Sequence, residues 1–309
     1  MTLVAGIDVG GSGVRARAVC DGRVVAETSA PGPVRISGAD LAPVITELLR
    51  PLSPDVVVIG CAGVATFGPA LRDPLLAAVT APRVAVCSDL LTAYAGGLGL
   101  TAGALREDGG AGVVLAAGTG AVAFGGAPST GWRRADGWGH LLGDDGGGGW
   151  IGRAGMRAAL RAVDGRPGGS APLLELLRAR AGEPAAVVAD LTGRADRAGV
   201  LAAFAPSVAE AAADDPVAAS ILAEAAGHLA DTARAAAGSG ARDVAVTGNL
   251  VRPGGRLAGL LERACRARGL EARAGAGTPL DGAVTLASAL GRGDVPAALA
   301  EAGALTVRD

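Results

Sequence analysis

The chain contains no lysine: all 28 basic residues among its 309 are arginine. This absence excludes three kinds of site at once, because a Walker A loop, the strand lysine of protein kinases and Schiff-base catalysis all require lysine. Any nucleotide site in this protein must therefore hold phosphates with backbone amides, hydroxyl groups and metal ions.

Cysteine and long apolar runs are also scarce. The four cysteines are far apart and lack CxxC spacing, which argues against structural zinc and a disulfide framework. No stretch approaches the roughly 18 continuous apolar residues that a membrane-spanning helix needs. A net charge of −2 with scattered arginines argues against a nucleic-acid surface. The beginning of the sequence lacks a basic signal-peptide segment, so we expect a cytoplasmic protein that binds neither membrane nor nucleic acid.

The first glycine-rich stretch follows an apolar run, residues 4–9, that contains Asp8. Alternating apolar residues at 14–19 predict a second strand directly after it. The glycine tip of such a hairpin can bring backbone N–H groups close to an anion. Its candidate residues are Gly10, Gly11, Ser12 and Gly13. The dinucleotide pattern GxGxxA also matches here but needs a following helix, and a hairpin without a ligand stays an alternative.

The same unit recurs in the second half of the chain. An apolar run at 113–117 is followed by Gly118, Thr119 and Gly120 and then by a short strand at 121–124. This repetition predicts an internal duplication. The glycine-rich segment 96–112 between the units predicts a domain junction, with domains at 1–108 and 109–309. Two such loops facing each other would hold a polyphosphate between them.

Asp89 follows a short apolar strand, 83–87, and precedes a helix. A carboxylate at the carboxyl edge of a sheet lies where α/β folds bind their ligands. The alternative is structural, because either Ser88 or Asp89 suits the N-cap of that helix.

The segment from Gly131 to Gly149 holds the third candidate site. The three tryptophans of the chain, Trp132, Trp138 and Trp150, cluster in or beside it, near Asp144 and Asp145. Aromatic faces beside carboxylates suit a hydroxyl-rich ligand. The alternative is that the tryptophans only hold a glycine-rich loop in place.

Periodicity elsewhere predicts an α/β fold. We expect strands near 23–28, 55–60, 83–87, 243–247 and 271–274, and helices near 39–50, 69–79, 150–163, 171–181, 195–213, 216–238, 255–268 and 283–290.

In order, the DxGGSG hairpin, Asp89 after a strand, the GTG turn, GWGHLLGDDG and VTGN resemble the BadF/BadG/BcrA/BcrD-type ATPases. That group includes the eukaryotic-type N-acetylglucosamine kinases, within the fold shared by actin, heat-shock ATPases and sugar kinases. The resemblance implies two ribonuclease-H-like domains with ATP in the cleft between them. It further implies a helical insertion in the second domain and a last helix that packs back on the first.

The resemblance also implies roles for individual residues. Asp8 would be the carboxylate associated with Mg²⁺, through water, and Asp89 the general base. The phosphate loops would be Gly10, Gly11, Ser12 and Gly13 in the first half and Thr119 and Gly120 in the second. Gly248 and Asn249 would lie on the adenosine side. Gly137, Trp138 and Asp144 would bind the sugar.

Two departures from the family pattern concern the sugar. Pro33 lies where similar kinases carry a sugar-contacting asparagine. Asp145 replaces the usual glutamate, and 147–149 are glycines where a Ser-Ala-Tyr-like run is usual.

The expected function is ATP-dependent phosphorylation of N-acetylglucosamine or glucosamine at the 6-hydroxyl, by a homodimer. One alternative is an ATPase that activates a partner enzyme, although such activators carry an iron–sulfur cluster on a cysteine motif that nothing here matches. The other is a non-enzymatic sugar sensor. Repressors on related folds have a DNA-binding helix pair ahead of the first strand, whereas the first strand here is expected from Leu3.

Overall fold

The computed structural model describes residues 2–10, 13–31, 37–101, 103, 111–127, 131–194, 196–238, 240–295 and 305–309. Gly11, Ser12, Pro33 and the expected domain junction near residue 108 lie outside these ranges.

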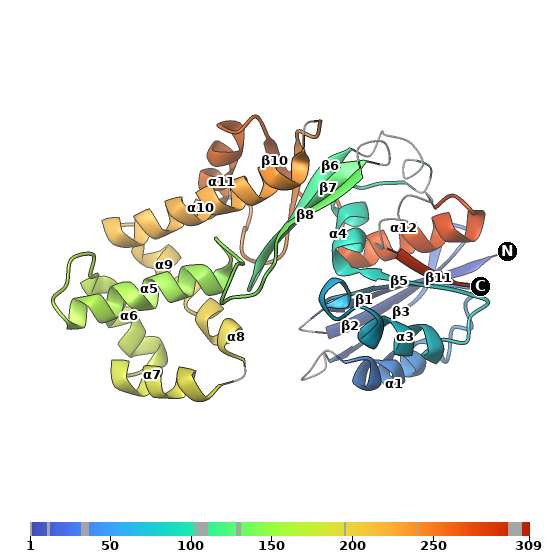
Figure 1. Cartoon of the computed structure of the whole chain (residues 1–309), viewed down its shortest axis with the longest axis horizontal. Coiled ribbons are helices and arrows are strands. Elements are labelled where there is room, and N and C mark those ends of the chain that lie inside the picture. The colour runs from blue at the N-terminus through green and yellow to red at the C-terminus, as the bar shows by residue number, and fades with distance from the viewer. Residues whose placement is uncertain are drawn as a thin grey trace.

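The first sheet has the strand order β11-β5-β4-β1-β2-β3. Its antiparallel part is β1 (Leu3–Gly10), β2 (Gly13–Cys20) and β3 (Arg23–Pro31). Its parallel part adds β4 (Val56–Cys61) and β5 (Arg83–Ser88) beside β1. The last strand, β11 (Leu305–Arg308), pairs antiparallel with β5, so both ends of the chain lie at this sheet (Figure 1).

The second sheet repeats this arrangement in the order β10-β9-β6-β7-β8. An antiparallel meander, β6 (Gly112–Ala117), β7 (Ala121–Ala127) and β8 (Gly131–Asp136), is again extended on its first strand by two parallel ones. These are β9 (Asp243–Thr247) and β10 (Glu271–Ala274). The shared strand order confirms the duplication that the two glycine units predict.

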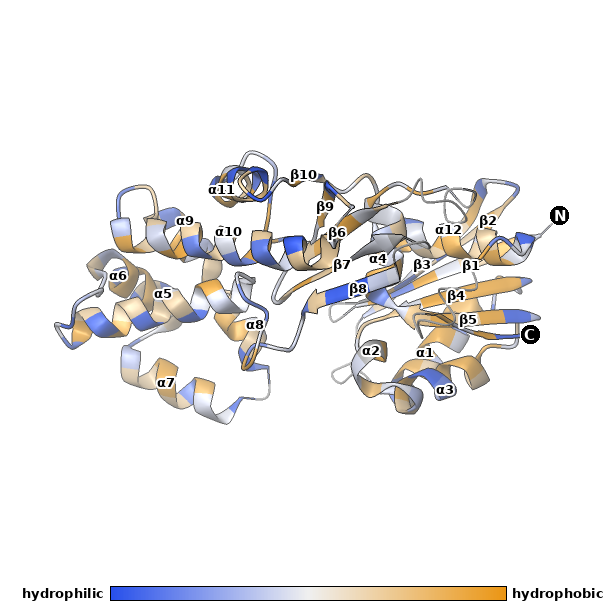
Figure 2. Ribbon diagram, turned by 45° about the horizontal axis from the view of Figure 1, so that its top comes forward, coloured by the Kyte–Doolittle hydropathy of each residue, from blue (hydrophilic) through white to orange (hydrophobic). Residues whose placement is uncertain are grey.

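Helices separate and flank the two sheets. The first sheet is covered on one face by α1 (Gly38–Leu49) and α3 (Pro69–Ala78), with the short α2 (Val64–Phe67) beside them. Between the sheets lie α4 (Asp89–Gly97) and α12 (Pro279–Arg292), in one apolar cluster with residues of both sheets. In Figure 2 the ribbons of β4 and β5 are coloured mainly as hydrophobic, and these two strands are almost wholly buried.

The other face of the second sheet carries the remaining helices, which extend away from the first sheet (Figure 1). They are α5 (Gly148–Val163), α6 (Ala171–Ala181), α7 (Pro184–Gly193), α8 (Arg197–Ala202), α9 (Ala205–Ala211), α10 (Pro216–Ala237) and α11 (Arg256–Arg266). No helix in the described ranges combines the length and the apolar character needed to cross a membrane.

The structure differs from the expected elements in several places. The helix expected at 195–213 is two helices, because Pro206 in the first turn of α9 favours a new start there. The last helix begins at Pro279 and not near 283, because Thr278 and Asp281 form a capping box. Four elements were not predicted: the short α2, the edge strands β8 and β11, and α7, which buries only Val187.

Glycines allow α4 and α12 to touch through their backbones. A Cβ built on Gly282 of α12 would lie 1.9 Å from the carbonyl oxygen of Thr92 in α4. One built on Gly96 of α4 would lie 1.9 Å from the carbonyl oxygen of Thr278. No side chain larger than hydrogen fits at either crossing point.

The same layer rests on the first sheet through two more glycines. A Cβ on Gly6 of β1 would lie 2.5 Å from the backbone nitrogen of Val284 in α12. A Cβ on Gly60 of β4 would lie 2.5 Å from Thr92 of α4. The backbone of α12 therefore lies directly against β1, and Thr92 of α4 lies directly against β4. The position of each helix depends on the position of the strand beneath it.

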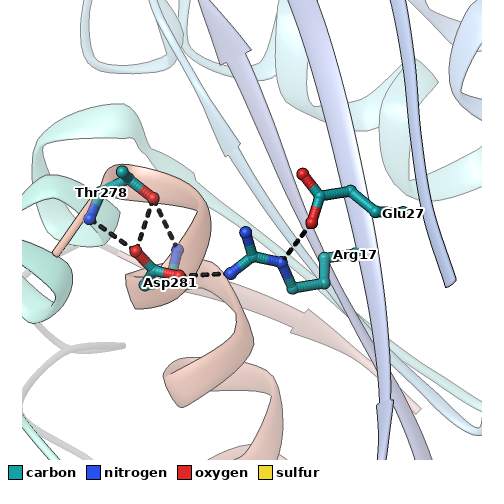
Figure 3. A network of polar contacts seen from close by, with 4 residues as sticks. All are labelled: Arg17, Glu27, Thr278 and Asp281. Carbon is teal, nitrogen blue, oxygen red and sulfur yellow. Dashed lines mark hydrogen bonds and ion pairs between the residues drawn. The ribbon is translucent and has the colours of Figure 1, made fainter. Parts of the chain in front are cut away.

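A polar network fastens the start of α12 to the same sheet (Figure 3). Arg17 on β2 donates to Glu27 on β3 at 2.8 Å and to the carboxylate of Asp281. Asp281 also accepts the backbone N–H and the hydroxyl of Thr278, each at 2.7 Å. Although burial raises it, the pKa of Asp281 is lowered overall by the bonds from Thr278 and Arg17. Asp281 thus caps the N-terminus of α12 and also binds that helix to β2 through Arg17.

We predict that Gly282→Ala lowers the free energy of unfolding by at least about 2 kcal/mol, because the added methyl group overlaps the backbone of α4. Gly291→Ala is the matched control in the same helix, since its Cβ would meet nothing closer than 3.4 Å. That change should be neutral or stabilise by about 0.5–1 kcal/mol. Chemical denaturation measures both. Equal stability of the two variants would refute the close crossing.

Candidate functional site

Two carboxylates lie at the carboxyl edge of the first sheet. Asp8 is near the end of β1, and Asp89 begins α4 directly after β5. The strand β4 lies between β1 and β5, with Asp8 opposite Gly60 and Gly60 opposite Cys87. The sheet therefore brings two acidic groups that are 81 positions apart in the sequence to one edge, close enough for the charge of Asp89 to raise the pKa of Asp8.

Ser88, not Asp89, caps α4. The hydroxyl of Ser88 accepts the backbone N–H of Leu90 at 3.3 Å and lies 3.2 Å from the Asp89 carboxylate, to which it donates. The cap that the sequence offers at either residue is thus supplied by the serine. Asp89 is the first residue of the helix, and its carboxylate accepts bonds from the hydroxyl of Ser88 and the backbone N–H of Leu90.

Burial raises the pKa of Asp89 above its ordinary value. The hydroxyl of Ser88, the N–H of Leu90 and the charge of Arg134 oppose that rise. Arg134 lies on β8 of the second sheet, so Asp89 interacts with both sheets.

The pKa of Asp8 is raised to about 6, first by burial and then by the charge of Asp89, while Arg15 on β2 lowers it. No hydrogen bond to the Asp8 carboxylate is found among the described residues. A half-buried carboxylate that lacks donors suits a cation, and Mg²⁺ in phosphate sites is commonly held by one or two carboxylates together with phosphate oxygens. No group of three or more His, Cys, Asp or Glu side chains that could hold a metal occurs among the described residues.

Two of the predicted loop glycines have no structural reason to be glycine. A Cβ on Gly10 would meet nothing closer than 3.9 Å, and one on Gly118 nothing within 4 Å. Neither residue has a positive φ. Glycine at such positions fits a backbone that a ligand approaches closely. These two glycines lie in the corresponding hairpin turns, β1–β2 and β6–β7.

The second turn is packed against the start of α5. The N–H of Gly148 donates to the carbonyl of Gly118 at 2.8 Å, and that of Gly149 donates to the carbonyl of Thr119 at 2.8 Å. A Cβ on Gly147 would lie 2.7 Å from the backbone of Gly120. Gly147 and Gly148 therefore leave no room for a side chain against this turn, whereas a Cβ on Gly149 would be less crowded, at 3.2 Å from the carbonyl oxygen of Thr119.

Gly248 and Asn249 lie beside the same turn. Gly248 has φ +94°, and a Cβ there would lie 2.3 Å from the carbonyl oxygen of Ala117. The chain then returns, with the N–H of Leu250 donating to Ala117 at 3.2 Å. The structure thus brings Thr119, Gly120, Gly248 and exposed Asn249 to the carboxyl edge of the second sheet.

The loop that carries Gly137, Trp138 and Asp144 is closed at its base by Asp136. The Asp136 carboxylate accepts the N–H of Asp144 at 2.7 Å and that of Asp145 at 2.9 Å. The carboxylate of Asp144 in turn accepts backbone bonds from Ala121 and Gly139, although burial raises its pKa overall. Asp144 therefore links the start of β7, beside the 118–120 turn, to the loop from Gly137 to Asp144, which we call the tryptophan loop. This structural role is separate from any contact with a sugar.

The structure separates the three tryptophans. Trp132 stacks on Phe124 with ring centroids 5.4 Å apart and meets Tyr94 edge-on at 5.1 Å, in the layer between the sheets. Trp150 packs on His228, with centroids 5.0 Å apart. Trp138 alone has an exposed side chain, at 70 %. Trp132 and Trp150 are therefore packing residues, and their ring contacts are with Phe124, Tyr94 and His228.

Sequence reasoning missed Arg134 and Asp136. The signal was their alternation with Trp132 in a short strand, which the glycine-rich surroundings obscured. Among the described contacts, the charge interaction of Arg134 with Asp89 joins the two groups of candidate residues, whereas no hydrogen bond or ion pair links the turn at Gly10 and Gly13 to the turn at 118–120. A cavity of about 320 Å³ between α5 and α10 lies apart from both.

Comparison with known structures identifies the fold. A candidate N-acetylglucosamine kinase from Chromobacterium violaceum matches with a TM-score of 0.73 and 26 % identity, over 93 % of this chain and 99 % of that one. A second candidate, from Porphyromonas gingivalis, matches with a TM-score of 0.67 and 18 % identity, over 94 % and 100 %. A ROK family glucokinase from Streptomyces griseus, solved with glucose and AMPPNP, gives 0.57 and 19 %, over 93 % and 99 %.

The mixed α/β fold with two sheets is thus that of the sugar-kinase branch of the actin-like ATPases. Residues 5–261 match the model of the BadF/BadG/BcrA/BcrD ATPase family, and the chain belongs to that family. The resemblance inferred from the motifs is confirmed. A search of curated proteins gave no match.

Because its pKa is raised, ionisation of Asp8 lowers the free energy of unfolding, by an amount that depends on pH. Between the ordinary value of 3.8 and about 6 the folded state binds the proton more tightly than the unfolded state, so this group lowers stability as the pH rises through that window. We expect Asp8→Asn to raise the free energy of unfolding at pH 8, on the order of 2 kcal/mol, and to have little effect near pH 3.5.

Thermal or urea unfolding across this pH range provides the measurement. Asp243→Asn serves as the control, since this exposed residue at the start of β9 lies away from the site. An Asp8→Asn protein that is less stable than wild type at pH 8 would show that the carboxylate has a structural partner.

Proposed function

We propose that this protein is an ATP-dependent sugar kinase that transfers a phosphoryl group to the 6-hydroxyl of an amino sugar, N-acetylglucosamine or glucosamine. The observation that carries the proposal is Asp89: a buried carboxylate at the carboxyl edge of one sheet, beside the helix cap that Ser88 supplies, whose charge interacts with Arg134 of the other sheet. The family match and the likeness to a candidate N-acetylglucosamine kinase at 26 % identity support it.

Asp89 is proposed as the general base. A base works best when its pKa lies near the working pH, and burial raises the pKa of Asp89 in that direction. The carboxylate would accept the proton of the sugar 6-hydroxyl as that oxygen attacks the γ-phosphorus. The bond between the γ-phosphorus and the β,γ-bridging oxygen breaks, and ADP leaves with that oxygen.

ATP is proposed to lie in a cleft between the two sheets, with its phosphates against the two hairpin turns. The open Cβ positions at Gly10 and Gly118 support close approach of phosphate to the backbone. Gly11, Ser12, Gly13, Thr119 and Gly120 would complete the phosphate contacts, and Gly248 and Asn249 would lie toward the adenosine. Backbone donors at both turns explain how phosphates are held without lysine.

Asp8 would hold Mg²⁺ through water. When bound, the ion supplies charge that stabilises the transferring phosphoryl group. The burial of Asp8 and its lack of hydrogen-bond donors support this role, because a nearby cation would favour the ionised carboxylate.

The sugar is proposed to lie against the loop from Gly137 to Asp144. The exposed indole of Trp138 offers a face for the C–H surface of a pyranose ring, and Asp144 offers carboxylate acceptors for hydroxyl groups. A homodimer in the cytoplasm is part of the same proposal, and light scattering of the purified protein tests the dimer.

A panel of sugars decides the substrate. We expect ADP release, followed in a coupled assay with ATP and Mg²⁺, to be fastest with N-acetylglucosamine or glucosamine and at least tenfold slower with glucose and mannose, since a site that hydrogen-bonds the 2-substituent discriminates by about 1.4 kcal/mol or more. Phosphorylation at the 6-hydroxyl is checked by NMR of the product. Sugar binding in calorimetry without ADP release would indicate a sensor, and ADP release that no sugar stimulates would indicate an ATPase.

Asp89→Asn tests the base. Because the cap belongs to Ser88, we expect this variant to fold and to bind ATP as wild type does, while turnover falls roughly 10²–10⁴-fold. Asp243→Asn is the matched control at an exposed site and should keep full turnover. Turnover of Asp89→Asn within about threefold of wild type would remove Asp89 from the mechanism.

A further inference from the structure

Arg134 lies on the face of β8 that is turned toward the layer between the sheets. Side chains alternate along a strand, so Trp132, Arg134 and Asp136 share one face. The ring of Trp132 contacts Tyr94 of α4, which fixes the direction of that face. Arg133 points the other way, toward the end of α10, where its guanidinium carbon would lie 3.4 Å from a Cβ on Gly238.

Three interactions hold the Arg134 side chain. Its Nη2 donates to the carbonyl oxygen of Gly137. Its guanidinium carbon lies 5.0 Å from the ring centroid of Trp138, in a cation–π contact. Its charge faces Asp89. The Nε–H is buried and has no acceptor among the described residues, so these contacts determine where the guanidinium lies.

Arg134 differs in charge from the other groups that interact with Asp89. The groups that interact electrostatically with Asp89 from neighbouring elements are Asp8 on β1, Cys61 on β4, Cys87 on β5 and Arg134 on β8. Arg134 is the cation in this set. It is also the member that contacts the tryptophan loop, through both Gly137 and Trp138.

We propose that Arg134 is a positioning residue that fixes the tryptophan loop relative to Asp89. Its planar guanidinium orients the indole by stacking on it and holds the loop backbone at Gly137, while its charge faces the carboxylate at the start of α4. Arg134 thereby sets the distance between the surface that takes the sugar ring and the group that takes the hydroxyl proton. The identity of these two surfaces rests on the proposed kinase function.

Two conservative variants separate the effect of stacking on Trp138 from the effect of the positive charge near Asp89. Arg134→Lys keeps the positive charge but loses the planar group that stacks on Trp138, so KM for the sugar should rise roughly tenfold with kcat within about twofold of wild type. Arg134→Gln loses the charge facing Asp89, so kcat should also fall, roughly tenfold. KM for ATP should stay within about twofold in both, because Arg134 contacts neither hairpin turn. Arg133→Gln, on the opposite face of the same strand, is the matched control and should change none of these values.

A cycle of single and double variants tests the contact without any assay of activity. Melting temperatures are measured for wild type, Arg134→Lys, Trp138→Ala and the double variant. We expect Arg134→Lys to lower the melting temperature of wild type and to have a clearly smaller effect when Trp138 is already alanine.

The outcomes distinguish the two proposals. If wild type phosphorylates no sugar, the kinase proposal fails, and the cycle alone decides whether Arg134 fixes the loop. If wild type is active, unchanged KM for sugar in Arg134→Lys overturns the positioning role. Additive melting temperatures in the cycle overturn it in either case, as does an equal effect of Arg133→Gln.

Discussion

The close contact between α4 and α12 is the constraint on which the rest of the molecule depends. Both helices lie between the two sheets, and their backbones meet at Gly96 and Gly282 without a side chain between them. Because α4 begins at Asp89, the position of this helix also sets the position of the candidate base. A change in the crossing would move Asp89 relative to β1 and relative to the second sheet at the same time.

This constraint explains why charge interactions can join residues from distant parts of the chain. The charge of Asp89 raises the pKa of Asp8 on β1, and the charge of Arg134 on β8 lowers that of Asp89, so the two partners of Asp89 come from different sheets. In a chain without lysine, arginines beside each carboxylate supply the local positive charge: Arg15 acts on Asp8 and Arg134 on Asp89. Arginine suits that task because its planar group also stacks and forms directed hydrogen bonds.

Sequence patterns predicted the strand that carries Asp8 and the strand that ends just before Asp89, because buried strands appear as short apolar runs and the two glycine hairpins repeat. They did not predict β11, a strand of four residues at a sheet edge, or β8, whose alternation is hidden by two adjacent arginines and glycine-rich surroundings. Arg134 was missed because it lies on β8. The capping role of Ser88 needed coordinates, because two adjacent residues were equally suited to it. Nor do helical periodicities show that Gly282 meets Thr92, since that contact joins segments far apart in the sequence.

The return of the chain to its first sheet has a consequence for synthesis on the ribosome. One face of β1 and β4 is covered by α12, and β5 is paired with β11, so the first sheet is completed by residues 279–292 and 305–308. Arg308 adds bonds to the carbonyls of Leu76, Val79 and Ala81 at the end of α3. Until those last residues emerge, a nascent chain exposes an apolar sheet face and an open strand edge, which are the features that chaperones bind and that aggregation exploits. Folding of the first half is thereby tied to completion of the second.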